Sequence, residues 1–204
     1  MPFAQTYADQ TNQVQIAKQA PGAELATERF PLAAGADPSI KFGSASSVQF
    51  QVRIFGMFKK LGSFTDIKGA LSVQKDTVQV SARIQTASTT MKSSSDAALL
   101  KSPAYFDAEH FPEIVFQSTR FPIATLRNGG QISGKLTVRG ITQPQIFKLT
   151  AKPCSKKFVQ QQPWRCSFNV AGTLKRSEFG MKARRGIVSD EVELTLSIDA
   201  SEGH

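Results

Sequence analysis

Residues of the types that carry enzyme chemistry are scarce in this chain. Its only histidines are His110 and His204, and His204 is the final residue. A catalytic triad with a histidine base, or a metal site of several histidines, would therefore have to be built around one residue. We interpret His110, in the stretch AEHFP, as a turn residue that packs against Phe111.

The paired carboxylates give no stronger indication of catalysis. Asp107 with Glu109, and Asp190 with Glu191, fall at expected strand or helix ends, where charged side chains are ordinarily solvated. The chain has no G-x-S-x-G motif, no phosphate-binding glycine loop and no cysteine spacing typical of a metal site. We expect a protein that is not an enzyme, with no metal, no catalytic residue and no cofactor.

The two cysteines bear on the compartment. Cys154 and Cys166 flank the polar stretch PCSKKFVQQQPWRC, which lies between two apolar segments. A disulfide between them would close a loop of 11 intervening residues and stabilise the fold by about 3 kcal/mol. This pairing favours an oxidising compartment. The alternative is a cytosolic protein with two buried free thiols.

Alternating apolar residues predict an all-β fold. Residues 191–200 place apolar side chains on one face and charged or hydroxyl side chains on the other, which is typical of a strand with one buried face. The alternation recurs at residues 48–54, 69–73, 78–84, 114–118, 132–138, 147–151 and 168–174. Eight such strands are the number at which a closed barrel is either filled by its side chains or holds one small ligand.

Turn residues separate several strands, and they lie at Lys75-Asp76, Asn128-Gly129-Gly130 and Gly140 to Pro144. Short connections of this kind predict antiparallel neighbours. The longest connection, residues 93–111, contains a predicted short helix over residues 97–100, capped by Ser95 or Asp96. This helix either covers a mouth of the barrel or packs against its outside.

Phenylalanine dominates the aromatic residues, with fifteen Phe against two Tyr and one Trp. Phe supplies a large apolar area without a polar atom that needs a partner. A cavity lined by Phe would accept hydrocarbon, whereas the alternative is that the rings fill a solid core. Glycines at the inward positions 69, 134 and 172 let the strands bend or leave room for a ligand.

The formal net charge is +9, although residues 1–40 hold two basic and four acidic groups. Basic residues gather at positions 175, 176, 182, 184 and 185, where Glu178 is the one acid. Such a patch can attract nucleic acid, an anionic membrane or a phosphorylated head group, or it can be a solvated loop. We do not expect nucleic acid, because stacking on bases needs more exposed aromatic residues among the cations.

Five short motifs, in order along the chain, resemble the YceI-like family of lipid-binding proteins. They are S-V-x-F from residue 47, G-S-F-T-D-I-K-G from residue 62, S-P-x-Y-F-D-A-E-x-F-P from residue 102, G-x-L-T-V-R-G-I-T from residue 134 and R-S-E-F-G-M from residue 176. The resemblance covers residues 41–200, which we expect to be the barrel domain. Residues 1–40 have no match and suggest an extended N-terminal arm, and residues 201–204 form a tail.

The resemblance implies a lipocalin-like, antiparallel eight-stranded barrel that encloses a long isoprenoid chain. We expect the inward residues of the strands to line a tunnel for this ligand: Phe50, Val52, Ile54, Phe64, Leu71, Val80, Ala82, Ile84, Phe116, Gly134, Leu136, Phe147, Leu149, Phe168, Val170, Leu194 and Leu196. Arg176, Lys182 and Arg184 are the candidates for the ligand head group. Alternatively, Arg176 holds the bend through Glu178 or Asp190.

The leading hypothesis is therefore a non-catalytic protein that binds, transports or sequesters a polyprenyl phosphate or the tail of an isoprenoid quinone. Its competitors are a solid-core interaction domain with a basic face, and an enzyme that acts on the lipid inside the barrel. An anionic membrane surface and a homodimer stay open as partners. Residues 1–38 have no signal peptide and no membrane span, so the protein is either cytosolic or, as we expect, a mature periplasmic or secreted form.

Overall fold

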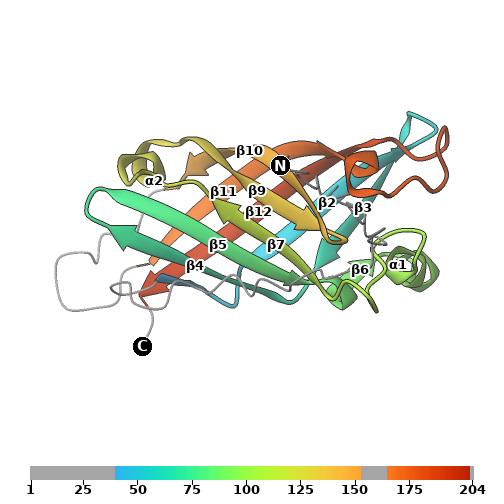
Figure 1. Ribbon diagram of the computed structural model, residues 1–204, viewed down its shortest axis with the longest axis horizontal. Coiled ribbons are helices and arrows are strands. Elements are labelled where there is room, and N and C mark those ends of the chain that lie inside the picture. Colours follow the sequence, from blue (N-terminus) through green and yellow to red (C-terminus); the bar gives the residue numbers. More distant parts are fainter. Residues whose placement is uncertain (1–39, 153–164, 203–204) are drawn as a thin grey trace, which may run out of the picture. The chain divides into compact units, whose positions relative to one another are not determined.

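The computed structural model describes residues 40–152 and 165–202, which belong to one compact unit (Figure 1). The strands are β1 (Ile40–Phe42), β2 (Ser47–Ile54), β3 (Phe58–Phe64), β4 (Ile67–Gln74), β5 (Thr77–Gln85), β6 (Thr89–Met91), β7 (Glu113–Ser118), β8 (Phe121–Pro122), β9 (Gly130–Val138), β10 (Ile141–Ala151), β11 (Arg165–Lys175) and β12 (Glu191–Glu202). The helical elements are η1 (Thr86–Ser88), α1 (Ser94–Lys101), α2 (Ala124–Asn128) and η3 (Arg176–Phe179).

These strands form one closed antiparallel barrel. β12 pairs with both β1 and β2, so β1 and β2 together form one barrel strand that is interrupted once. On the other side, β2 pairs with β3 and β1 pairs with β4, so β3 and β4 form a second interrupted strand. β5 and β6 form a third interrupted strand, because they pair with β4 and β3 respectively. With β7, β9, β10, β11 and β12 the described residues give eight barrel strands, and the pairing of β1 with β12 closes the ring. The predicted fold class is confirmed.

The alternation of residues along each strand decides what faces the interior. In β5, Val78, Val80, Ala82 and Ile84 are buried, and the residues between them are half-buried. The buried residues form two clusters. One surrounds Leu126 of α2, and the other surrounds Phe50 and Phe179 near α1. Phe116, Leu194 and Leu196 pack against both clusters, so they mark the middle of the barrel.

Two of the predicted turns differ from the structure. Asn128 is the last residue of α2, and Gly129 caps this helix at a φ of 78°. Pro144 lies inside β10 and pairs with Lys135. A proline is tolerated there because the pairing of β10 with β11 begins only at Lys148, so the missing N–H removes no bond to β11.

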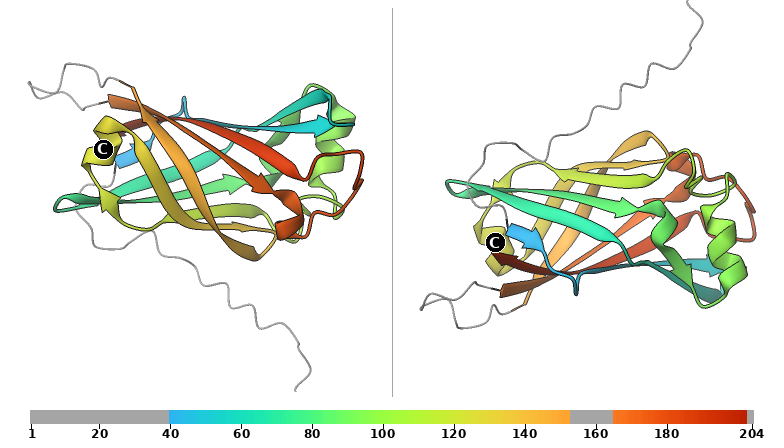
Figure 2. Two further views of the ribbon diagram at one scale, coloured as in Figure 1. Left: turned by 90° about the horizontal axis from the view of Figure 1, so that it is seen from above. Right: turned by 90° about the horizontal axis from the view of Figure 1, so that it is seen from below.

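The predicted inserted helix is present as α1, but its cap was assigned to the wrong residue. Ser93, rather than Ser95 or Asp96, precedes the first turn, and its hydroxyl accepts a hydrogen bond from the Asp96 N–H at 3.3 Å. α1 lies at one end of the barrel and α2 at the other (Figures 1 and 2).

Some predictions fall on residues that the structure does not describe. The N-terminal arm up to residue 39, the end of the tail and Cys154 lie outside the described residues. The disulfide between Cys154 and Cys166 therefore stays a prediction. No helix within 40–152 or 165–202 is long and apolar enough to cross a membrane.

Candidate functional site

An apolar cavity of about 170 Å³ lies inside the barrel. Leu126 of α2 lines it at one end, and Leu100 of α1 with Tyr105 and Phe106 lines it at the other. The cavity thus extends between the two helical ends, and its exposed wall is formed by apolar atoms.

Most of the predicted tunnel residues lie on the wall of this cavity. They are Phe50, Val52, Phe64, Leu71, Val80, Ala82, Ile84, Phe116, Leu136, Phe147, Leu149, Phe168, Val170, Leu194 and Leu196. The period-2 pattern brings them together because every strand turns the same face inward.

Two of the predicted tunnel residues do not line the cavity. Ile54 is the last residue of β2 and pairs with Val188 at the end of the barrel, because the strand leaves the ring there. Gly134 is buried, but a Cβ at this position would lie 2.4 Å from the Gln117 carbonyl oxygen and 2.7 Å from the Phe116 ring. The neighbouring strand therefore occupies the space that we expected a ligand to use.

Phe116 over Gly134 is one of four pairs in which a Phe ring covers a glycine of the adjacent strand. The others are Phe50 over Gly62, Phe42 over Gly69 and Phe147 over Gly172. In these three pairs a Cβ on the glycine would lie 2.2–2.4 Å from a ring carbon, compared with 2.7 Å for Gly134. The inward glycines thus let the Phe rings approach the backbone of the neighbouring strand closely. The rings, rather than open space, are what the glycines accommodate.

A cluster of rings closes the α1 end of the cavity. Phe50 and Phe64 lie 5.4 Å apart between ring centroids, and Phe106 lies 6.2 Å from Phe50 and 5.5 Å from Phe64. Phe106 and Leu100 come from the segment around α1, so this segment covers a mouth of the barrel rather than its outside.

The expected set omitted several wall residues. Val48, Ile114, Ile132, Val138, Val192 and Ile198 share the inward parity of their strands and could have been included on that signal. Leu100, Tyr105, Phe106, Leu126, Met181 and Val188 lie outside the strands. Alternation along the chain cannot find these residues, because their positions depend on how the helices and loops close the two ends.

Arg176 is the one predicted head-group residue on the cavity wall, and its side chain is almost fully buried at 4% exposure. Its guanidinium donates hydrogen bonds to four backbone carbonyls: Nε to Ser189 at 2.9 Å, Nη1 to Met181 and Ala183 at 2.8 Å each, and Nη2 to Val188 at 3.1 Å. These bonds hold the segment between η3 and β12. They agree with the structural alternative for Arg176, although the acceptors are carbonyls rather than the carboxylates of Glu178 or Asp190.

Lys182 and Arg184 do not line the cavity. Both are exposed on the segment 182–190 that follows η3. Arg184 takes a φ of 51°, and its carbonyl accepts hydrogen bonds from the N–H groups of Ile187 and Val188. The two cations therefore lie at the α1 end of the barrel, outside the apolar interior.

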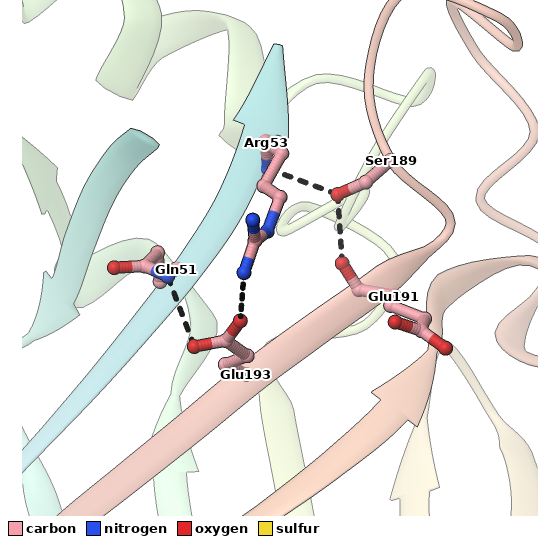
Figure 3. Close-up of polar contacts among 5 residues, drawn as sticks. All are labelled: Gln51, Arg53, Ser189, Glu191 and Glu193. Carbon is pink, nitrogen blue, oxygen red and sulfur yellow. Dashed lines mark hydrogen bonds and ion pairs between the residues drawn. The ribbon is translucent and has the colours of Figure 1, made fainter. Parts of the chain in front are cut away.

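A polar network joins this segment to the hairpin formed by β2 and β3 (Figure 3). The Arg53 N–H donates to the Ser189 hydroxyl at 2.9 Å, and the Ser189 N–H donates to the Arg53 carbonyl at 2.8 Å. Glu193 accepts hydrogen bonds from Gln51 at 2.9 Å and from Arg53 at 3.3 Å. The hairpin and the segment thus form one rim.

Asp190 fastens the same segment to η3. Its carboxylate accepts hydrogen bonds from the Ser177 N–H at 2.9 Å and from the Ser177 hydroxyl at 2.6 Å. The bond from the Ser177 hydroxyl lowers the pKa of Asp190 below its ordinary value, with a smaller contribution from the charge of Arg176.

Titratable groups are nearly missing from the cavity. Among the described residues that line it, Arg176 and Tyr105 are the two with titratable side chains. His110 lies outside the cavity with 69% of its side chain exposed, and its Nδ1 lies 2.8 Å from Asp107 Oδ1. No group of three or more His, Cys, Asp or Glu residues able to hold a metal is present in the parts of the chain described.

The chain is similar in sequence to bacterial proteins of the UPF0312 group. One from Pseudomonas aeruginosa is 28% identical over 169 residues, which span 78% of this chain and 83% of the relative. One from Photorhabdus laumondii is 28% identical over 166 residues, which span 77% and 81% of the two chains.

Solved structures share the fold. The crystal structure of BcnA from Burkholderia cenocepacia has a TM-score of 0.64 at 19% identity and covers 76% of this chain and 95% of its own. A polyisoprenoid-binding domain from Saccharophagus degradans has a TM-score of 0.63 at 11% identity, covering 82% and 100%. A family model described as the YceI-like domain matches residues 41–200. With the motifs, the closed barrel and this match in agreement, the chain belongs to the YceI-like family.

Proposed function

We propose that this protein is a non-catalytic binding protein for a long isoprenoid lipid, which it carries or sequesters inside the barrel. The observation that carries the proposal is the apolar cavity that extends from α2 to α1 within a closed barrel. A hydrocarbon chain gains free energy when such a wall removes it from water. The polyisoprenoid-binding domain of Saccharophagus degradans, which has the same fold, supports this choice of ligand class.

The competing functions have less support. A solid-core interaction domain would need the inward rings to fill the barrel, but Phe50, Phe116 and Phe168 border a cavity instead. An enzyme would need groups that exchange protons or attack the substrate, and the described wall offers only Arg176 and Tyr105. The donors of Arg176 are largely used by backbone carbonyls.

The volume of the cavity shows what a long ligand requires. Pockets for small molecules are commonly about 300–1,000 Å³, whereas this cavity is about 170 Å³. A long chain can therefore enter only when wall side chains move. The Phe rings at the barrel ends can rotate about their side-chain torsions, so we propose that these rings turn as the chain threads between them.

The head group of the ligand belongs, in this proposal, at the α1 end. Arg176 supplies the positive charge on the wall there, and Lys182 and Arg184 lie on the exposed segment outside it. A phosphate or a quinone oxygen at this end would meet these cations, whereas α2 contributes the apolar residue Leu126 to the wall at the other end. We further propose an exported or periplasmic location, which rests on the predicted cysteine pair.

Native mass spectrometry of the purified protein, followed by lipid extraction, tests the proposal. We expect the protein to retain an apolar ligand, or to take up an offered prenol after it has been stripped of lipid. A protein with no bound lipid and no uptake of short, medium or long prenols would overturn the proposal. The matched control is a small polar amphiphile, which the apolar wall should not retain.

A further inference from the structure

Four large apolar side chains are exposed together at the α1 end of the barrel. Phe55 is 62% exposed, Met57 74%, Phe58 63% and Ile187 41%. We call these four residues the apolar tip. The first three lie in or beside the turn between β2 and β3, and Ile187 joins them because its carbonyl accepts a hydrogen bond from the Phe55 N–H at 2.7 Å.

The turn keeps a phenylalanine in an unfavourable conformation. The Met57 N–H donates to the Ile54 carbonyl at 3.1 Å, and the two residues between them have positive φ values, 51° at Phe55 and 71° at Gly56. Glycine adopts this region readily, but a bulky residue rarely does. The Phe55 ring is exposed, so burial within the fold does not offset this backbone strain. A strained position that keeps such a ring indicates that the ring contacts something other than the rest of this chain.

Cations surround the apolar tip. Residues 53–61 and 182–189 hold six basic residues and no acidic residue: Arg53, Lys59, Lys60, Lys182, Arg184 and Arg185. Arg53 pairs with Glu193 and Lys60 pairs with Asp96. The other four cations are exposed. Asp190 and Glu191 follow directly in the chain, but basic residues still outnumber acidic ones next to the apolar side chains.

The apolar tip is adjacent in the chain to residues that line the cavity. Ile54, directly beside Phe55, pairs with Val188, and Val188 and Val52 both line the cavity wall. Hydrogen bonds from Arg53 to Ser189 and to Glu193 hold the β2–β3 hairpin against segment 182–190 and the start of β12 (Figure 3). The exposed rings therefore sit on a fixed rim at the α1 end of the cavity, as Figures 1 and 2 show for the β2–β3 hairpin and α1.

We propose that the apolar tip docks this protein on an anionic lipid bilayer. Phe55, Met57 and Phe58 enter the boundary between head groups and acyl chains, while Lys59, Lys182, Arg184 and Arg185 bind lipid phosphates. Apolar contact combined with attraction to anionic lipids is the physical basis of such interfacial binding. This docking places the α1 end of the cavity at the membrane. Its use for lipid exchange rests on the proposed function.

A bilayer fits the apolar tip better than a protein partner. A stable protein interface buries at least about 1,000 Å² with matched shape, and a hairpin turn with one neighbouring loop offers a small projecting surface. A fluid bilayer needs no complementary shape. The combination of exposed aromatic and cationic side chains is also what the charged surface and apolar interior of an anionic membrane recognise.

Co-sedimentation with vesicles tests the docking. The wild type should bind vesicles of equal parts phosphatidylcholine and phosphatidylglycerol, and bind phosphatidylcholine alone much less. The Phe55→Ser/Phe58→Ser variant should lose at least about tenfold in affinity because it removes two insertable rings. Its control is Ile146→Ser, an equally exposed apolar residue on β10 that should bind like the wild type.

A second set of variants tests the cations. Lys182→Gln/Arg184→Gln/Arg185→Gln should weaken binding to anionic vesicles and reduce its salt dependence. Lys135→Gln/Lys148→Gln, on the exposed faces of β9 and β10, should change binding little. Circular dichroism verifies that each variant is folded.

Several results would overturn the docking: wild type that does not bind anionic vesicles, tip variants that bind like the wild type, or equal binding to neutral and anionic vesicles. A dimer that dissociates in Phe55→Ser/Phe58→Ser, with no vesicle binding, would show that the apolar tip contacts a second copy instead. A different result would contradict the proposed function and leave the docking intact: the wild type would bind anionic vesicles but contain no lipid on extraction.

Discussion

At the scale of single residues, phenylalanine and glycine act as pairs in this barrel. Gly62, Gly69, Gly134 and Gly172 each lie under a Phe ring from the adjacent strand. A ring that lies close over a glycine covers the backbone there with apolar surface. The abundance of Phe and the inward glycines, which look like separate signals in the sequence, are thus one packing arrangement.

Gly134 gives the sharpest test of this packing. Replacement by Ala places a methyl group 2.4 Å from the Gln117 carbonyl oxygen, and a backbone atom cannot easily move away. We expect Gly134→Ala to lower the free energy of unfolding by about 1–3 kcal/mol. Chemical denaturation measures the change.

The matched control is Gly43→Ala, because the nearest heavy atom to its new Cβ lies at an ordinary 3.5 Å. We expect a change of less than about 1 kcal/mol there. Equal stability of Gly134→Ala and the wild type would contradict the close approach of β7 and β9.

Among the residues that the structure describes, His110 has a pKa raised above its ordinary value. The hydrogen bond to Asp107, aided by the charge of that carboxylate, raises the pKa of His110 above 6.5. Because the folded value is the higher one, this pair contributes its stability below the unfolded pKa and loses it as the pH rises through the folded pKa.

An NMR titration of His110 should therefore give a midpoint above 6.5 in the wild type. Asp107→Asn should move the midpoint down, because it removes the carboxylate. A wild-type midpoint at or below 6.5 would show that the pair does not form in solution.

At the scale of elements, the segment from η3 to β12 is organised around one arginine. The backbone carbonyls of this segment at residues 181, 183, 188 and 189 all accept hydrogen bonds from the Arg176 guanidinium. This arrangement explains why the family motif R-S-E-F-G-M begins with a residue that is buried rather than free to meet solvent. The exposed cations on the segment depend on Arg176 for their positions.

Removing Arg176 should therefore loosen the whole segment. We expect Arg176→Gln to lower the free energy of unfolding by about 3 kcal/mol or more, since hydrogen bonds to a charged group are worth about 1.5–3 kcal/mol each and the acceptors lose their donor. Denaturation in urea measures the change, and hydrogen exchange shows whether it is concentrated in residues 181–190.

Lys182→Gln is the control on the same segment, and as an exposed substitution it should stay within about 0.5 kcal/mol of the wild type. If Arg176→Gln were equally stable, the carbonyl contacts would not be what orders the bend.

At the scale of the whole molecule, closure of the barrel creates the cavity. The two core clusters meet at Phe116, Leu194 and Leu196, and Ala82 pairs with Phe116 in this middle region. Ala82 is a small residue on the cavity wall. Under the proposed function, a larger side chain at this position would limit the length of the hydrocarbon chain that the barrel holds.

Ala82→Phe should shorten the preferred ligand without unfolding the barrel. In the wild type, affinity for a series of prenols should climb with length by about 0.8 kcal/mol per buried methylene until the cavity is full. In the variant this increase should stop at a shorter prenol, because the new ring blocks the middle.

Thr195→Phe, on the exposed face of β12, should leave the length preference unchanged. Equal affinity of short and long prenols in both the wild type and Ala82→Phe would mean that the chain does not thread through the barrel. Gly134→Phe would not serve as such a test, because the Phe116 ring and the Gln117 carbonyl oxygen occupy the space beside Gly134.

The cysteine pair is a prediction of the sequence that bears on the whole molecule. If Cys154 and Cys166 form a disulfide, unfolded and unreduced protein should show no reactive thiol. Two thiols per chain would contradict the disulfide, and with it much of the argument for an exported protein.

The sequence by itself determined the class of fold and most of the cavity wall. A strand with alternating apolar residues, such as 78–84, can bury its apolar side in only one orientation. The alternation along the chain is therefore enough to place Val80, Ala82 and Ile84 inside. The number of strands and their short connections then predict the closed barrel.

Only the tertiary structure decided what happens between strands and at the two ends. Gly134 has the correct parity, yet its neighbour Phe116 fills the space, and that contact depends on the register of β7 against β9. Arg176 binds carbonyls that come together when the segment folds over it. Phe55 and Ile187, 132 positions apart in the chain, share one exposed tip because β2 and the segment before β12 meet at one rim. Local periodicity carries no information on such contacts, because they arise from residues that the closed chain brings together.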